Sequence, residues 1–193
     1  MSNSRVMIFI DGSNLFWALR TRGLQIEYSK LIEFLVGSRS LIRTYYYGAE
    51  KVPPDPAQTG FYEMLKFQGI TVVTKPLVRR TSWATLLSNN TRVQIVKEEE
   101  KGVDVALVTD MLSMAYKSAF DTAISVGADA DFENAIDNIK RIPRRVEIAA
   151  FSDTDRSNVP PRYTSTVCRE MRMIADRFIP LEDHIDKFRR TQV

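Results

Sequence analysis

The sequence comprises 193 residues, of which 44% are hydrophobic and 26% charged, with a formal net charge of +3. These values describe an ordinary globular domain with a full core, which excludes a largely disordered chain and makes a second independent domain unnecessary. The mild positive charge permits nucleic-acid binding without requiring it. One histidine and one cysteine, Cys168, exclude an internal disulfide and a Cys/His zinc site, so any metal must be held by oxygen.

The sequence gives no signal for a membrane or for export. No apolar run approaches the roughly 20 residues of a membrane span, and the start of the chain lacks a signal-peptide pattern. We therefore expect a cytoplasmic protein without a membrane partner. Residues 1–193 are expected to form one domain, with a motif-bearing core at about 5–150 and a C-terminal helical extension at about 160–193.

The first part of the chain alternates strand and helix patterns. Strands are predicted where β-branched and aromatic residues cluster, and helices where apolar residues recur three and four positions apart. The predicted strands are Val6–Ile10, Leu41–Tyr47 and Ile70–Thr74, and the predicted helices are Asn14–Arg22, Ser29–Val36 and Ala57–Gln68. Ser13 or Asn14 is expected to cap the first helix, and Ser29 the second.

The segment Lys75–Lys97 is the least regular, and its end, Arg92–Lys97, alternates like a strand or a hairpin arm. Because the segment follows the carboxyl end of a strand, Arg79 and Arg80 are expected near any site at that edge, where they could hold a phosphate backbone. The alternative is a solvated excursion with Trp83 packed against the body.

The stretch after Lys101 predicts a helix with one buried face. The predicted buried stripe consists of Val105, Val108, Leu112, Ala115 and Ala119. Asp104 then lies in the first turn, where a negative charge also suits the unpaired N–H groups and the helix dipole. Asp110 lies about 9 Å further along the axis and about 120° around it, so it is only an auxiliary candidate.

Two predicted strands run directly into acidic segments. Val6–Ile10 leads into Asp11, and the apolar strand Thr122–Val126 leads through a glycine to Asp129 and Asp131. Parallel strands deliver their carboxyl ends to one edge of a sheet, and open α/β sheets bind ligands there. Helix geometry brings Asp104 to the same edge. Clustered carboxylates repel one another unless a hard cation such as Mg²⁺ or Mn²⁺ neutralises them.

The last third of the chain completes the pattern. Val146–Ala150 is predicted as a strand, Tyr163–Ala175 as a helix and Phe178–Leu181 as a short edge strand. Asp153 and Asp155 follow a strand end and form a reserve pair of acids. The charges Lys140 to Arg145 precede a strand, so they are expected at the opposite edge of the sheet as a solvated turn.

Three motifs, in this order, resemble those of the bacterial NYN domains of the PIN-like metal-dependent ribonuclease superfamily. They are Asp11-Gly-Ser-Asn14, Lys101-Gly-Val-Asp-Val105 followed by Asp110, and Gly127-Ala-Asp-Ala-Asp-Phe132. The resemblance covers about residues 5–150. It implies an α/β, three-layer PIN-like fold with a mostly parallel central sheet flanked by helices, and an acidic cluster that holds Mg²⁺ or Mn²⁺ for cleavage of RNA.

The resemblance also implies roles for single residues. Asp11 and Asp129 are expected as direct metal ligands, and Asp104 and Asp131 as ligands that act directly or through water. Ser13 and Asn14 would help to position the substrate, a role that does not exclude helix capping.

The third motif departs from the family pattern. The family usually has Ser-Gly-Asp-Ser-Asp-Phe, whereas this chain has Gly127, Ala128 and Ala130 in place of Ser, Gly and the second Ser. The acids are retained and the hydroxyls are lost. A non-catalytic RNA-binding or regulatory module that retains the fold is therefore the alternative to a ribonuclease. RNA is the expected partner, and a homodimer is allowed for. The sequence lacks the glycine-rich turn of dinucleotide-binding sheets after its first strand.

Overall fold

The computed structural model describes residues 4–85, 92–127, 129–152 and 169–190. The predictions made for Asp153, Asp155 and Cys168, and for the beginning of the helix Tyr163–Ala175, concern residues outside these ranges.

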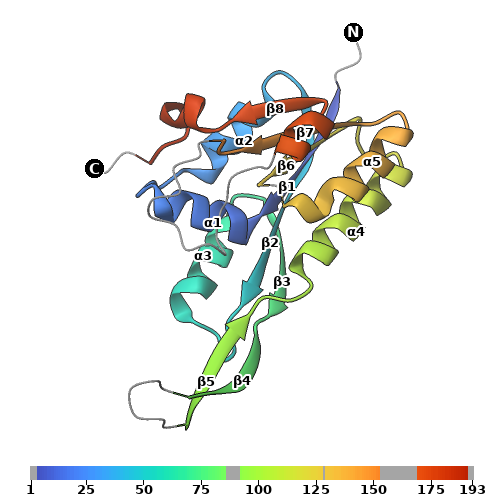
Figure 1. Cartoon of the computed structure of the whole chain (residues 1–193). Coiled ribbons are helices and arrows are strands. Elements are labelled where there is room, and N and C mark those ends of the chain that lie inside the picture. Colours follow the sequence, from blue (N-terminus) through green and yellow to red (C-terminus); the bar gives the residue numbers. More distant parts are fainter. Residues whose placement is uncertain (1–3, 86–91, 128, 153–168, 191–193) are drawn as a thin grey trace.

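A parallel sheet forms the centre of the fold (Figure 1). In the described ranges it has six strands in the order β3-β2-β1-β6-β7-β8, and all neighbouring strands are parallel. These strands are β1 (Arg5–Asp11), β2 (Ser40–Glu50), β3 (Thr71–Pro76), β6 (Thr122–Val126), β7 (Arg145–Ala150) and β8 (Arg177–Pro180). The chain winds from β1 out to β3 and later returns to the other side of β1. The sheet therefore has a topological switch point between β1 and β6.

Helices cover both faces of the sheet and complete the three layers that the sequence predicted (Figure 1). The helices are α1 (Gly12–Thr21), α2 (Tyr28–Val36) and α3 (Pro56–Phe67) on one face, and α4 (Val103–Tyr116), α5 (Glu133–Arg141) and α6 (Arg169–Ile174) on the other. The structure also contains two short 3₁₀ segments, η1 (Ala130–Phe132) and η3 (Glu182–Lys187). None of the described helices has the length and apolar character needed to cross a membrane.

The central strand β1 feeds two separate hydrophobic cores. Its side chains alternate between the faces of the sheet: Ile8 and Ile10 pack with α1 and α2, whereas Met7 and Phe9 pack with α4 and α5. All four side chains are almost completely buried. A strand buried on both faces reads as a continuous apolar run, which is why β1 could be recognised in the sequence.

Two predicted helix caps are wrong. Helix α1 begins at residue 12, and the carboxylate of Asp11 caps it by accepting a hydrogen bond from the Asn14 backbone N–H at 3.0 Å. Ser13 therefore lies inside the helix. Helix α2 begins at Tyr28, without a side-chain cap, so Ser29 also lies inside. The Tyr28 ring is buried in the core, and its packing sets the start of α2 in place of a capping hydroxyl.

The buried face of α4 also differs from the predicted stripe. Val105, predicted to be buried, is 67% exposed. The buried residues are Val103, Leu107, Met111 and Ala115. Apolar side chains occur on several sides of this helix, so the spacing alone could not decide which face packs on the sheet. The prediction that Asp104 lies in the first turn is confirmed.

The C-terminal segment is more than a helical extension. Strand β8 pairs with β7 and forms the edge of the sheet, as the pattern at Phe178–Leu181 predicted. Pro180 ends this strand, where its missing N–H is tolerated. The segment η3 contacts α2. Within the segment expected as a helical extension at about 160–193, Arg177–Pro180 therefore contributes a strand to the central sheet.

A two-stranded antiparallel arm extends beyond the carboxyl edge of the sheet (Figure 1). It consists of β4 (Val78–Thr85) and β5 (Arg92–Glu99). The prediction that Arg92–Lys97 forms a strand or a hairpin arm is confirmed. Trp83 is 60% exposed, so it does not pack against the body of the protein.

Candidate active site

The switch point of the sheet lies between two strands that end in acidic segments. In the parallel ladder between β1 and β6, Ile10 pairs with Val126, so Asp11 and Gly127 are the next residues of the two strand ends. Asp129 follows two residues later. Open α/β sheets bind ligands in the crevice outside the carboxyl ends at such a point.

Asp11 is the buried acid of the site, with only 4% of its surface exposed. Burial, together with the charges of Asp104, Glu100 and Asp129, raises its pKa to about 7, against the lowering effect of the hydrogen bond from the Asn14 N–H. The neighbouring carboxylates therefore lie within electrostatic reach of Asp11, as strand polarity predicts.

Asp104 joins the cluster from the opposite layer. It lies in the first turn of α4, which follows Gly102 in a left-handed conformation with φ of 76° and has no side-chain cap. Desolvation raises the pKa of Asp104, and the charges of Asp129 and Asp131 add to this rise. The start of α4 thus brings an acid to the edge where β6 ends.

Asp129 and Asp131 are exposed, like Asp104. Asp129 precedes η1 and accepts a hydrogen bond from the Asp131 N–H at 3.4 Å. Behind them, the fully buried Phe132 anchors this short segment in the core beneath α4 and α5. The backbone is therefore held, while both carboxylates stay accessible to solvent.

Glu100 is a fifth acid that the sequence analysis missed. It accepts a hydrogen bond from the Ser13 hydroxyl, and desolvation and the charge of Asp104 raise its pKa. The signal was present in the sequence: Glu100 lies four residues before Asp104, between the arm and α4. Because it follows a run of glutamates, it looked like part of a solvated charge cluster.

Asn14 lies against Gly127, which explains the glycine in the third motif. Gly127 has a φ of 78°, and a Cβ placed on it would lie 3.0 Å from the Asn14 side-chain oxygen. A family-typical serine at this position would therefore meet both backbone strain and the Asn14 amide. In this chain, the side chain of Asn14 occupies space beside the end of β6.

Gly127→Ala is expected to lower the free energy of unfolding by about 1–2 kcal/mol, because an L-residue is strained in the left-handed region. Gly60→Ala is the matched control, since a Cβ at this helical glycine meets nothing within 4 Å. It should stabilise the protein by up to about 1 kcal/mol. Urea unfolding of both variants measures the difference, and a neutral Gly127→Ala would contradict this account of the glycine.

Asp110 and Tyr46 each make a defined contact in the structure. Asp110 accepts a hydrogen bond from the Tyr47 hydroxyl at 3.0 Å, and its charge helps to raise the Tyr47 pKa. This contact supports an auxiliary, structural role for Asp110.

The buried Tyr46 ring occupies the space beside Gly12, where a Cβ added to Gly12 would come within 2.4 Å of the ring. Sequence reasoning did not connect Tyr46 with the site.

Arg79 and Arg80 lie at the root of the arm, and both form ion pairs. Arg79 contacts Glu98 at 3.2 Å, and Arg80 contacts Glu99 at 3.0 Å. Their side chains stay more than half exposed. Surface pairs of this kind are worth at most about 1 kcal/mol, so a phosphate could replace either glutamate.

The cluster provides the right donors for a divalent cation but is not preassembled around one. Among the described residues, no group of three or more acidic, histidine or cysteine side chains is close enough to hold a metal ion as it stands. All the candidate donors are carboxylate oxygens, which Mg²⁺ and Mn²⁺ prefer. The exposed Asp129 and Asp131 can turn toward Asp11, so the residues fit such an ion.

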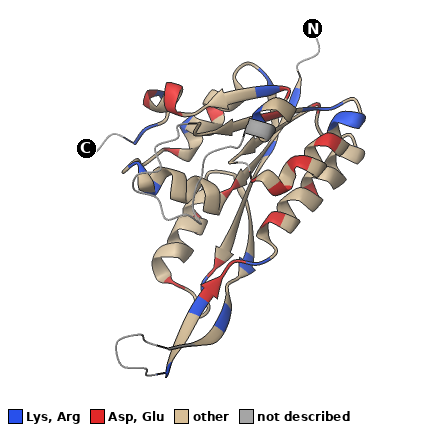
Figure 2. Ribbon diagram, in the orientation of Figure 1, with Lys and Arg blue, Asp and Glu red and all other residues tan. Residues whose placement is uncertain are grey.

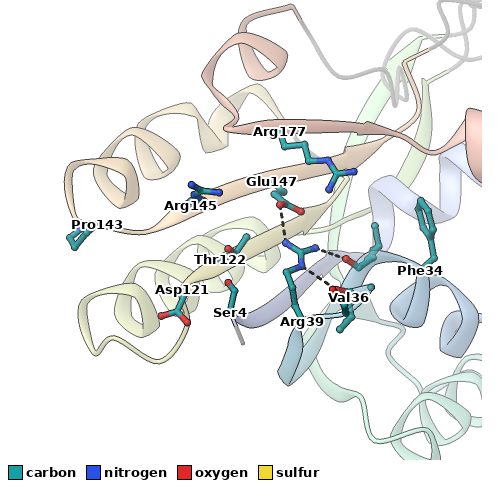
Figure 3. A pocket seen from close by; sticks show the side chains of 13 residues that line it. Ser4, Phe34, Val36, Arg39, Asp121, Thr122, Pro143, Arg145, Glu147 and Arg177 are labelled. Atoms are coloured by element: carbon teal, nitrogen blue, oxygen red, sulfur yellow. Dashed lines mark hydrogen bonds and ion pairs between the residues drawn. The ribbon is translucent and has the colours of Figure 1, made fainter. Parts of the chain in front are cut away.

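A cavity of about 740 Å³ lies at the opposite edge of the sheet (Figure 3). Arg39 crosses it and joins Glu147 to the last carbonyls of α2, with contacts of 2.8 Å to Glu147 and 2.6 Å to Leu35. Arg145 also lines this cavity, so the expectation that Lys140 to Arg145 lie away from the acids agrees with the structure.

Comparison with known proteins agrees with the fold. A parallel sheet with helices on both faces and acids at its switch point defines a nuclease-like α/β domain. The family model of the NYN domain matches residues 5–182, so the chain belongs to the NYN domain family. The match extends beyond the core expected at about 5–150 and includes β8.

Two relatives illustrate how broad the similarity is. The low amplitude and bright protein LabA of Synechococcus elongatus is 28% identical over 182 residues, which cover 93% of this chain and 85% of that protein. The crystal structure of a protein of unknown function, VPA0982 from Vibrio parahaemolyticus, aligns with a TM-score of 0.68 at 18% identity and covers 98% of both chains. The second similarity shows a shared fold.

Proposed function

We propose that this NYN domain is a metal-dependent ribonuclease whose site consists of Asp11, Asp104, Asp129 and Asp131. The observation that supports the proposal most is the electrostatic coupling of these acids at the switch point. Burial and the charges of Asp104, Glu100 and Asp129 raise the pKa of Asp11 to about 7, and burial and the charges of Asp129 and Asp131 raise the pKa of Asp104. Repelling carboxylates gathered at one edge destabilise the protein by themselves and become favourable when a divalent cation neutralises them.

Asp11 and Asp129 are the proposed direct ligands of Mg²⁺ or Mn²⁺, and Asp104 and Asp131 would act directly or through water. A bound cation would supply a Lewis acid that activates water and offsets the negative charge of the phosphodiester. The α1 N-terminus holds the Asp11 carboxylate in place through the Asn14 N–H. The buried Asp11 and the exposed Asp104, Asp129 and Asp131 would offer carboxylate oxygens to the cation from different elements.

Ser13, Asn14, Arg79 and Arg80 are the proposed substrate-binding residues. Ser13 and Asn14 lie in the first turn of α1 beside the acids, where a hydroxyl and an amide can contact ribose or phosphate oxygens. The two arginines lie at the root of the arm and can exchange their glutamates for phosphates. We also propose a cytoplasmic location. Light scattering tests whether the protein forms a homodimer.

A non-catalytic RNA-binding or regulatory module is the second candidate. Two observations favour it: Gly127 and Ala130 lack the hydroxyls that the family usually has, and the described acids are not preassembled around a cation. Such a module would keep the fold and bind RNA without cutting it.

The deciding experiment incubates the purified protein with single-stranded and structured RNA in Mg²⁺ or Mn²⁺. We expect cleavage that EDTA stops and that Asp129→Asn abolishes while RNA affinity is largely kept. The amide retains the shape of the side chain but removes charge needed for the cation. RNA that is bound but never cleaved by the wild type, across metals and substrates, would establish the regulatory module instead.

A further inference from the structure

The surface beside the acids carries two arginine–aromatic pairs on separate elements. On α1, Phe16 is 48% exposed, and the guanidinium of Arg20 lies 5.8 Å from the centre of its ring. On the arm, Trp83 is 60% exposed, and the guanidinium of Arg92 lies 5.9 Å from the centre of its ring. Each pair presents an aromatic surface next to a positive charge.

The elements that carry the two pairs meet at the candidate active site. Ser13, in the first turn of α1, donates a hydrogen bond to Glu100, the residue that follows β5. Phe16 lies one turn from this contact, about 4.5 Å along the helix axis. The eight residues of β5 reach about 26 Å in the other direction, out along the arm (Figure 1). The two elements therefore both extend from the contact between Ser13 and Glu100.

The arm forms a two-stranded sheet of its own, separate from the central sheet. An isolated two-stranded ribbon is marginally stable in water. Its apolar side chains face solvent, with Val96 58% exposed in addition to Trp83. Within the described residues, Arg92 and Lys97 form no ion pair, whereas the two arginines at the root are neutralised by glutamates. Trp83 and Arg92 therefore lie in the outer part of the arm, whereas Lys97 is paired with Arg80 nearer the root, where Glu98 and Glu99 also lie (Figure 2).

We propose that the Phe16–Arg20 and Trp83–Arg92 pairs bind single-stranded RNA on two sides of the acids, so that the substrate is single-stranded. Unpaired bases stack on aromatic rings while arginines contact the phosphates. Bases inside a duplex are already stacked on each other and cannot use these rings. A second copy of the chain fits the arm less well, since two positive arms repel each other. The choice of substrate rests on the proposed ribonuclease function, whereas the binding surface does not.

The test measures binding in EDTA, where cleavage is absent, with a labelled oligouridine and a duplex of the same length in fluorescence anisotropy. Phe16→Ala/Arg20→Ala and Trp83→Ala/Arg92→Ala are each expected to weaken oligouridine binding about tenfold or more. The matched control is Phe67→Ala/Arg145→Ala, which removes a 91% exposed phenyl ring and an exposed arginine from the opposite edge of the sheet. It should leave the affinity unchanged.

Two further measurements separate the outcomes. Trp83→Phe keeps an aromatic surface and should restore most of the affinity, which distinguishes stacking from damage to the arm. Equal weakening by the control variant, or equal binding of duplex and single strand by the wild type, overturns the inference. So does a Trp83→Ala/Arg92→Ala variant that turns a dimer into a monomer by light scattering without losing RNA affinity. A wild type that binds oligouridine through both pairs but cleaves no RNA supports the inference and overturns the proposed function.

Discussion

Asp11→Asn is expected to abolish RNA cleavage and, in the metal-free protein, to raise the melting temperature at pH 8. Asparagine can cap α1 as well as aspartate does, so the hydrogen bond from the Asn14 N–H is retained. The change removes the buried charge, which Glu100 and the other acids make unfavourable. Cleavage is lost because the proposed central ligand of the cation is no longer negative.

The gain in stability should depend on pH in a defined direction. Asp11 loses its proton near pH 3.8 in the unfolded chain and near pH 7 in the folded protein. Between these values the folded state binds more protons, so wild-type stability falls as the pH rises, by at most about 4 kcal/mol. The raised pKa values of Asp104 and Glu100 act in the same direction. Asp11→Asn should flatten this profile, with the two proteins similar near pH 4 and the variant more stable at pH 8.

Asp121→Asn provides a matched control with the opposite sign. Asp121 lies at the other edge of the sheet, and its contacts with Arg5 lower its pKa. The substitution should reduce stability at neutral pH and leave cleavage unchanged. Thermal unfolding at several pH values and an RNA cleavage assay check both variants. A destabilised but active Asp11→Asn would show that Asp11 is a structural cap.

Mg²⁺ or Mn²⁺ binding to the wild type at pH 6 is expected to release close to one proton. Asp11 is mostly protonated at this pH because its pKa is about 7, and a cation binds the ionised form. Calorimetry in buffers with different ionisation enthalpies counts the protons. The release should decline above pH 8, where Asp11 is already ionised.

The double variant Asp11→Asn/Asp129→Asn identifies the site of that binding. It removes the proposed direct ligands, so neither heat of binding nor proton release should remain measurable. Asp137→Asn, on the outer side of α5, keeps the number of acids at the site unchanged and should bind like the wild type. Equal affinity of wild type and double variant would place the cation elsewhere on the protein.

The sequence predicted the sheet and the shared acidic edge because both follow from short-range rules. Apolar strands that run into Asp11 and Asp129 carry their own direction, and parallel winding brings their ends to one edge. Asp104 could be placed as soon as the start of the helix after Lys101 was predicted. These inferences hold even when the predicted ends of the strands and helices are wrong by a few residues.

The remaining features depend on contacts between distant residues. Glu100 became a neighbour of Ser13 only when the arm folded back, 87 residues along the chain. The face of α4 depended on which of its apolar sides meets the sheet. Gly127 was read as a departure from the family pattern, and its reason, the side chain of Asn14, lies 113 residues earlier. The spacing of residues along the sequence contains no information about such long-range contacts.

Asp11 begins a helix and is also the proposed ligand at the centre of the site. Folding alone requires only an acceptor at this position, and asparagine meets that requirement without a buried charge. Natural selection for stability would therefore tend to replace the aspartate during descent. The ionised carboxylate lowers the stability of the metal-free protein by up to about 4 kcal/mol, and a bound cation would offset this cost. Across relatives of this chain, the ratio of Asp to Asn at this position should therefore record which lineages retain the chemistry.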